Sequence, residues 1–328
     1  MHFGSAGHFD TSISMKNIQD LRIVFMGTPE FAVASLDALV KAGCNIVGVI
    51  TAPDKPAGRG MQLQQSAVKK YAVDKNLNIL QPEKLKSPDF ISELKSLYAD
   101  VQVVVAFRML PEIVWNMPAM GTINVHASLL PQYRGAAPIN WAIINGEMET
   151  GITTFKLQQE IDTGHILLQE KISIGEKETA GELHDKLKNL GAKLIVKTIA
   201  GLAEDHIEEK PQLITHHSSL TIRHAPKLNT ETCKIDWNKT TGDIFNLIRG
   251  LSPYPTAFTY FDDKILKIYF AEKEITEHHY ENGSVHTDGK TYLKFACTDG
   301  FIHCTDMQVQ GKKRMSIQDF LRGYRLGK

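Results

Sequence analysis

Two short apolar runs near the N-terminus flank a helical segment, and this unit leaves few folds open to the chain. The first run covers residues 22–26 and ends in Gly-Thr-Pro-Glu at 27–30, and the second covers residues 46–50. Between them, apolar residues recur at helix spacing up to Gly43, a residue typical of helix ends. Because a strand–helix–strand unit favours parallel strands with a right-handed crossover, the segment predicts an α/β domain with a Rossmann-like parallel sheet.

The alternation of strands and helices continues along the chain. Helices are expected near 66–76, 88–98 and 111–116, and strands at 78–80, 101–107 and 122–126. The run at 101–107 is rich in valine, as expected of a parallel strand that is buried on both faces. After residue 150, two apolar segments at 152–157 and 166–174 resemble paired strands, and a long amphipathic helix is expected at 179–203. These elements complete the α/β domain.

The remainder of the chain has a different pattern. Residues 206–228 are polar and contain two prolines, which is typical of a linker laid over the surface. Beyond residue 228, a helix at 241–250 precedes short strands separated by turn signals, which predicts a smaller, mostly-β domain that resembles an OB barrel. The 328 residues are therefore predicted to form an unstructured extension (1–15), a catalytic domain (16–205), the linker (206–228) and a C-terminal barrel (229–328).

Composition excludes several classes of protein. Lys+Arg and Asp+Glu both number 37, so the formal net charge is zero and only a local patch can bind a polyanion. No apolar run reaches the roughly 18 residues of a membrane-spanning helix. The four cysteines are scattered, and no His/Cys/Asp cluster has metal-ligand spacing, so we expect a cytoplasmic protein without disulfides or a metal. No heptad repeat is present, and a monomer is expected.

Polar side chains end the strand expected at 122–126. Since side chains alternate across a strand, Asn124 and His126 project from one face, at the edge where open parallel sheets bind ligands. Amide and imidazole N–H groups that converge there can hold the oxygen of a polarised carbonyl. Alternatively, Asn124 caps the strand and His126 satisfies a loop. Asp162, in a turn between two apolar strands, is a third candidate, although an Asp in such a turn commonly forms an Asx-turn.

Several motifs, taken in order, resemble those of the formyltetrahydrofolate-dependent formyltransferases. They are Gly27-Thr-Pro, Pro53-Asp-Lys-Pro-Ala-Gly-Arg-Gly60, Asn124-Val-His126, Ser128-Leu-Leu-Pro131, Tyr133-Arg-Gly135, Ile161-Asp162-Thr-Gly164, Ile235-Asp-Trp237 and Ile248-Arg-Gly-Leu-Ser-Pro-Tyr-Pro255. The resemblance runs from about residue 21 to the C-terminus. The sequence departs from the family at 107–111, which lacks the Tyr-Gly turn that members often carry before Leu-Pro. We therefore expect the wall of the folate site to be shaped differently.

The resemblance implies an activity and a set of residues for it. The formyl group of 10-formyltetrahydrofolate is transferred to the α-amino group of methionyl-initiator-tRNA, which gives N-formylmethionyl-tRNA for translation initiation. Asn124 and His126 then stabilise the oxyanion and move the proton, with Asp162 as their carboxylate partner. The folate is expected to contact Ser128, Leu129, Leu130, Pro131, Arg108, Met109 and Leu110. The ledge formed by residues 129–131 is expected to hold its flat ring.

Two basic segments are candidate contacts for the tRNA, which the resemblance assigns in part to the C-terminal domain. Lys55 and Arg59 belong to a glycine-containing loop after the second strand. Lys312, Lys313 and Arg314 begin a segment, 311–328, in which six basic side chains face one acidic one. Such segments can follow a phosphate backbone. Each is also interpretable as an ordinary solvated surface, the commoner role of a charged run.

Other functions fit parts of the same sequence. A sugar-nucleotide N-formyltransferase shares the three polar residues and a similar two-domain layout. Glycinamide ribonucleotide transformylase fits less well, because that activity gives no function to the extra domain after residue 228. A non-catalytic folate- or RNA-binding module is a further alternative. The presence of all three polar side chains argues against it, because a protein without catalytic activity need not keep them. A nicotinamide-dependent oxidoreductase is disfavoured, because the turn at Gly27 lacks the G-x-G-x-x-G pattern.

Overall fold

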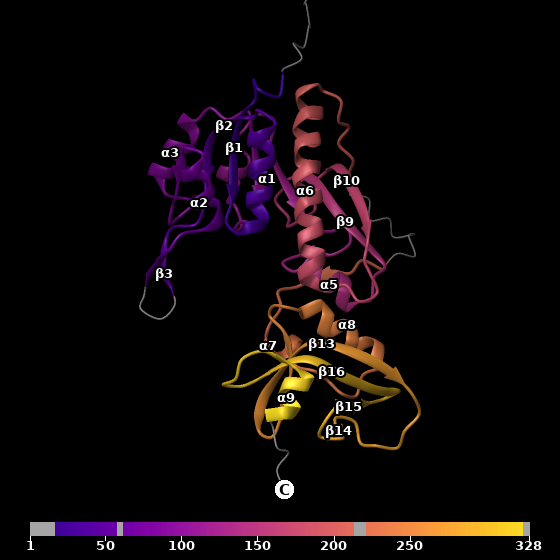
Figure 1. Cartoon of the computed structure of the whole chain (residues 1–328). Coiled ribbons are helices and arrows are strands. Elements are labelled where there is room, and N and C mark those ends of the chain that lie inside the picture. Colours follow the sequence, from indigo (N-terminus) through magenta and orange to yellow (C-terminus); the bar gives the residue numbers. More distant parts are fainter. Residues whose placement is uncertain (1–16, 58–61, 213–220, 324–328) are drawn as a thin grey trace, which may run out of the picture.

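The computed structural model describes residues 17–57, 62–212 and 221–323, and the extension predicted at 1–15 lies outside these ranges. Two domains stack end to end, the first around a mostly parallel sheet and the second around an antiparallel sheet (Figure 1). Each has its own buried apolar core. Within the described ranges, no helix combines the length and apolar character needed to cross a membrane.

The first domain contains a seven-stranded sheet in the order β10-β9-β7-β6-β1-β2-β5. Its strands are β1 (Arg22–Gly27), β2 (Asn45–Ile50), β5 (Ile79–Leu80), β6 (Val101–Val105), β7 (Thr122–His126), β9 (Glu149–Lys156) and β10 (Ile166–Ser173). The five strands from β7 to β5 pair in parallel, as the pattern of apolar runs predicts. The paired strands β9 and β10 continue this sheet, because β9 pairs antiparallel with β7.

Helices cover both faces of this sheet. They are α1 (Glu30–Lys41), α2 (Ala67–Asp74), α3 (Pro88–Ser96), α4 (Glu112–Trp115), α5 (Pro138–Ile144) and α6 (Ala180–Ala203). The cores on the two faces divide the residues of β1 alternately: Ile23 and Phe25 pack with α1 and α6, whereas Val24 and Met26 pack with α3 and α4. This two-sided burial explains why the central strands are apolar throughout. The helix α6 begins with a capping box in which Thr179 and Glu182 bond reciprocally.

The C-terminal domain is an antiparallel half-barrel. It contains α7 (Thr230–Cys233), α8 (Thr241–Leu251), β12 (Ala257–Phe261), β13 (Lys264–Ile275), β14 (Val285–Thr287), β15 (Leu293–Cys297), β16 (Gly300–Val309), β17 (Met315–Ser316) and α9 (Ile317–Gly323). The strand order is β12-β13-β16-β15-β14, and β17 pairs with β16. The mostly-β prediction is confirmed; in the part of the chain that the structure describes, no ladder joins β12 to β14, so the sheet stays open.

The segment between the domains is bonded to the first one more closely than a surface linker. Lys210 forms an antiparallel bridge with Ile166. Further on, β11 (His224–Ala225) pairs in parallel with β8 (Arg134–Gly135), and Ala225 is fully buried in the core of the first domain. Its polar composition indicated exposure, but backbone pairing with the first domain, which composition does not report, holds part of the segment in place.

The motif around residues 248–255 lies where the two domains meet. Arg249, on α8, is only 7% exposed. Its Nη1 donates to the carbonyls of Gly175 and Glu178 in the first domain, at 3.2 and 3.1 Å. Burial lowers the pKa of the guanidinium, against the opposing effect of the Glu178 charge. A single cation therefore satisfies two carbonyl groups across the interface.

The neighbouring glycine allows the helices of the two domains to approach closely. A Cβ on Gly250 would lie 2.7 Å from Cγ1 of Ile144 and 3.2 Å from the carbonyl oxygen of Asn140, both on α5. The Asn140 amide donates to the Gly250 carbonyl at 2.7 Å. The packing of α5 on α8 thus fixes one domain against the other.

We expect Arg249→Ala to lower the free energy of unfolding by about 2–3 kcal/mol, because buried carbonyls lose hydrogen bonds from a charged donor. Urea denaturation measures this loss. The matched control is Arg322→Ala: Arg322 is 76% exposed and pairs with Asp319, and the control should change stability by less than about 0.5 kcal/mol. Equal effects of the two variants would show that the interface does not depend on Arg249.

Candidate active site

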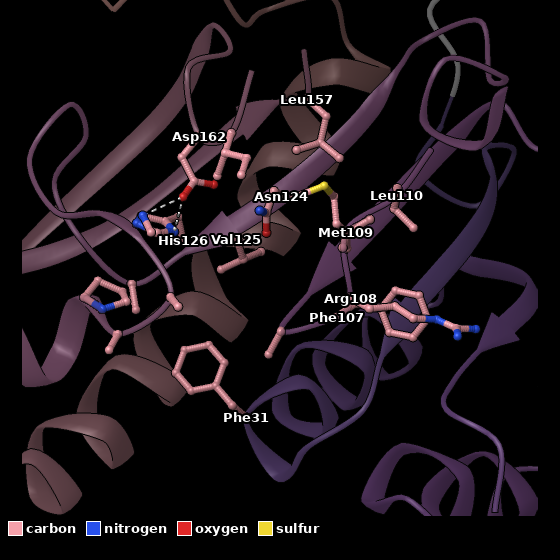
Figure 2. A pocket seen from close by; sticks show the side chains of 18 of the residues that line it. Phe31, Phe107, Arg108, Met109, Leu110, Asn124, Val125, His126, Leu157 and Asp162 are labelled. Atoms are coloured by element: carbon pink, nitrogen blue, oxygen red, sulfur yellow. Dashed lines mark hydrogen bonds and ion pairs between the residues drawn. The ribbon is translucent and has the colours of Figure 1, made fainter. Parts of the chain in front are cut away.

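A cavity of about 670 Å³ opens at the carboxyl ends of β6 and β7 (Figure 2). Its wall comes from the ends of these strands, the loops that follow them, the first turn of α1 and the loop between β9 and β10. The lining residues include Pro29, Phe31, Val104, Ala106 to Leu110, Trp115, Asn124 to Ala127, Gly135 to Asn140, Leu157 to Asp162, and His184. This is the edge at which open α/β sheets bind ligands.

His126, the last residue of β7, is held by one of its two ring nitrogens. Nε2 lies 2.9 Å from the carbonyl oxygen of Tyr133. A carbonyl oxygen can only accept, so Nε2 carries the hydrogen and donates it. In the neutral ring, Nδ1 is then left with a lone pair, and this nitrogen faces Asp162. The imidazole is 7% exposed, so its orientation is set by the protein rather than by solvent.

Tyr133 is itself fixed at a special backbone position. Its φ is +59°, in the left-handed region, and its hydroxyl donates to Glu147 Oε1 at 2.6 Å. Burial, followed by this hydrogen bond, raises the pKa of the phenol. The side chain is 4% exposed. A buried and hydrogen-bonded ring therefore aims the Tyr133 carbonyl at His126.

Asp162 reaches the same place from the loop between β9 and β10. Its φ is +54°, a conformation that Asp tolerates better than most residues, and it is 8% exposed. Its Oδ2 accepts a hydrogen bond of 2.9 Å from the backbone amide of Gly135 and lies 3.8 Å from Nδ1 of His126. The carboxylate thus points away from its own turn, unlike an Asx-turn, and toward the imidazole (Figure 2).

Asn124 lies two residues before His126 on β7 and lines the same cavity. Within the described residues, no hydrogen bond is made by its side-chain amide, although the side chain is partly buried. An amide with two donors and an acceptor that points into a cavity is available to a ligand. The structure therefore brings together all three polar residues that the sequence nominates.

The segment 106–110 forms the far wall of the cavity. Ala106 has φ of +46°, and Met109 is 74% exposed beside the buried Leu110. The Arg108 guanidinium turns out of the site, because it donates to the carbonyls of Pro82 and Glu83. Desolvation by burial lowers its pKa. Arg108 therefore lines the cavity, but its guanidinium is bonded to the carbonyls of Pro82 and Glu83 and does not face a ligand there.

The predicted ledge at 128–131 is not among the residues that line this cavity, and its contact with the folate stays a prediction. Ser128 is fully buried, and its hydroxyl donates to the Gln132 carbonyl at 2.6 Å. Leu130 is 3% exposed, and its amide donates to Thr153 Oγ1 at 3.1 Å. Leu129 and Pro131 flank Leu130 in this turn and are also absent from the lining. The chain bends inward after Ala127, so these residues support the loop that carries Tyr133.

Two lining residues at the opposite end were not nominated from sequence. Phe31 and His184 meet edge to face, with ring centroids 5.2 Å apart. Phe31 is 7% exposed, and its position in a helical pattern indicated only a core residue. Its position just after the first strand could have indicated a lining residue, since the turn there lies at the ligand-binding edge of the sheet.

None of the candidate tRNA residues that the structure describes lines the cavity. Lys55 begins β3 (Lys55–Ala57), which pairs with β4 (Gln62–Gln64) in a hairpin that projects from the first domain (Figure 1). Arg59 lies outside the described residues. In the C-terminal domain, Lys312 and Lys313 are exposed on the turn before β17. Arg314 forms a 2.7 Å ion pair with Asp306 and stacks over Tyr269 at 4.2 Å.

Comparison with known proteins covers nearly the whole chain. The family model described as formyl transferase matches residues 21–199, and the one described as formyl transferase, C-terminal domain, matches residues 227–325. A methionyl-tRNA formyltransferase of Parabacteroides distasonis is 54% identical over 94% of this chain and 97% of its own. One of Phocaeicola vulgatus is 56% identical, with the same coverage of both chains.

Among solved structures, a sugar 3N-formyl transferase described as WlaRD, bound to dTDP and 5-N-formyl-THF, superposes with a TM-score of 0.64. The match covers 89% of this chain and 99% of the other, at 22% identity. At this identity the likeness concerns the fold.

Proposed function

Since the chain belongs to the formyl transferase family, we propose that it transfers a formyl group from 10-formyltetrahydrofolate to the amino group of methionyl-tRNA. The observation that carries the proposal is the convergence of Asn124, His126 and Asp162 in one cavity, in a chain more than half identical to methionyl-tRNA formyltransferases over both domains. The acceptor is proposed to be the initiator tRNA, and the product N-formylmethionyl-tRNA for translation initiation.

The reaction requires the enzyme to align the amine with the formyl group, to stabilise the oxyanion and to transfer protons. As the amine attacks the formyl carbon, a new C–N bond forms and the formyl oxygen becomes an oxyanion. The bond to N10 of the folate then breaks, N10 leaves with the electron pair and gains a proton, and the attacking nitrogen loses one. An amine is already a nucleophile, so no serine or cysteine is required.

We assign the charge stabilisation to Asn124 and the proton work to His126. The free amide of Asn124 can donate to the developing oxyanion at no cost in existing hydrogen bonds. Because Nε2 of His126 already donates to the Tyr133 carbonyl, Nδ1 is the atom that takes up and returns the proton. Asp162, 3.8 Å from Nδ1, stabilises the imidazolium that forms.

The folate is proposed to occupy the end of the cavity walled by residues 106–110, Trp115 and Leu157. An apolar slot with a few exposed backbone groups suits a flat heterocycle. Residues 128–131, predicted to contact the folate, do not line this part of the cavity. The domain boundaries, a monomeric state, a cytoplasmic location and the absence of a metal remain predictions.

The tRNA is proposed to contact the hairpin at Lys55, together with Arg59, and the turn that carries Lys312 and Lys313. Arg314 contributes less charge to this surface, because Asp306 neutralises it. These segments project from different domains, so the fixed packing of α5 on α8 sets the distance that a tRNA must span.

His126→Ala and Asp162→Ala are each expected to lower kcat by at least about 10²-fold, the scale of one lost acid–base or electrostatic contribution. Formyl transfer to methionyl-initiator-tRNA, scored as formamide product, measures the effect. The matched control is His206→Ala, an exposed histidine, which should keep normal turnover. Near-normal kcat in either catalytic variant would contradict the assignment, and formylation of an amino-sugar nucleotide instead of the tRNA would favour the alternative substrate.

Neutralising Lys55 or the pair Lys312/Lys313 to Gln is expected to weaken tRNA binding and to reduce the slope of log affinity against log salt by about 1 for each phosphate that is no longer neutralised. Filter binding at several salt concentrations measures it. Lys193→Gln, on the exposed side of α6, is the control. A slope unchanged from that of the control would remove these lysines from the interface.

A further inference from the structure

Gln212, in the segment between the domains, uses both ends of its side-chain amide to join two loops of the active site. Its Nε2 donates to the carbonyl oxygens of Asp162 and Gly164, at 2.9 and 2.8 Å. Its Oε1 accepts from Nη2 and Nε of Arg134, at 2.6 and 3.1 Å. One partly buried side chain is thus fully hydrogen-bonded between the segments that carry Asp162 and Gly135.

The turn that Gln212 holds is one that needs support. Asp162 has a left-handed backbone, with φ of +54°. A Cβ on Gly164 would lie 1.6 Å from the carbonyl oxygen of Lys156, so the loop passes directly against β9. Such a conformation persists only where surrounding contacts over-determine it. The two hydrogen bonds from Gln212 fix the carbonyls on either side of Thr163, and with them the direction of the Asp162 side chain.

The other loop is held from the same side. Arg134, which donates to Gln212, is followed directly by Gly135, whose amide donates to the Asp162 carboxylate at 2.9 Å. Gln212 therefore bonds to Asp162 itself and to Arg134, the residue that precedes Gly135. The bridge between Lys210 and Ile166 fixes the backbone just before Gln212.

We propose that Gln212 is a positioning residue for the catalytic carboxylate, so that the segment linking the two domains is part of the active-site framework. This inference rests on the proposed function. Gln212 does not line the cavity, and it acts through Asp162 rather than on the substrate. Gln212 lies after α6, the last helix of the first domain. We therefore expect turnover to depend on the segment between the domains as well as on the first domain.

Gln212→Ala is expected to lower kcat by about 10-fold or more, the scale of losing a group that orients a catalytic residue. The KM for 10-formyltetrahydrofolate should stay unchanged, because the folate wall is not touched. The matched control is Gln132→Ala. Gln132 also bonds the interdomain segment, accepting from the Arg223 amide at 2.9 Å and donating to the Thr221 carbonyl at 3.3 Å, but it does not touch Asp162. Its kcat should stay close to the wild-type value.

Two further variants separate positioning from general damage. Gln212→Glu keeps the acceptor for Arg134 but turns an oxygen toward the carbonyls of Asp162 and Gly164, so it should lose kcat as the alanine variant does. In an Asp162→Asn background, Gln212→Ala should cost less than about 2-fold, because residues that act as a unit are not additive.

Formylation of methionyl-tRNA by the wild-type protein tests the proposed function separately. Given that activity, an unchanged kcat in Gln212→Ala would overturn the positioning role. So would a full, additive loss in the Asp162→Asn background, or an equal loss in Gln132→Ala.

Discussion

One hydrogen bond, from the backbone amide of Gly135 to the carboxylate of Asp162, joins the two loops on which the site depends. It brings a side chain from beyond β9 to within 3.8 Å of an imidazole at the end of β7. Gly135 has φ of +124°, and a Cβ there would lie 2.5 Å from the carbonyl oxygen of Ala225. A side chain at residue 135 would therefore clash with β11, while the backbone amide of the same residue donates to the Asp162 carboxylate.

The sheet and its strand ends were predictable because their causes are local. Valine-rich runs between helical patterns indicate buried parallel strands, and alternation along 122–126 places Asn124 and His126 on one face. The proximity of Asp162 to His126 was not predictable from the residues, since it depends on a long-range hydrogen bond; only the family resemblance suggested it. The position of residues 128–131 outside the cavity lining was not predictable, because alternation ends with the strand and an apolar tripeptide does not reveal which way the loop turns.

The same limit applies to the interdomain segment. Its composition is that of an exposed linker, and nothing in the residues around Gln212 indicates that one amide bonds two distant loops. Arg249 is similar: its motif was visible, but its role as a buried cation between carbonyls of the other domain required the fold. Arg249 bonds the C-terminal domain to the first domain, and Gln212 bonds the segment between the domains to two loops of the first domain. The segment and the interface are therefore bonded to the domain that carries the candidate site.

The assignment of the proton to Nδ1 depends on how His126 is held, and this can be observed directly. In ¹⁵N-labelled protein at a pH where the ring is neutral, ¹⁵N chemical shifts and ring couplings identify which nitrogen carries hydrogen, with His126→Asn as the reference for assignment. The hydrogen bond to the Tyr133 carbonyl predicts a protonated Nε2 and a bare Nδ1 beside Asp162. A ring protonated at Nδ1 and bare at Nε2 would contradict the proposed chemistry at its centre.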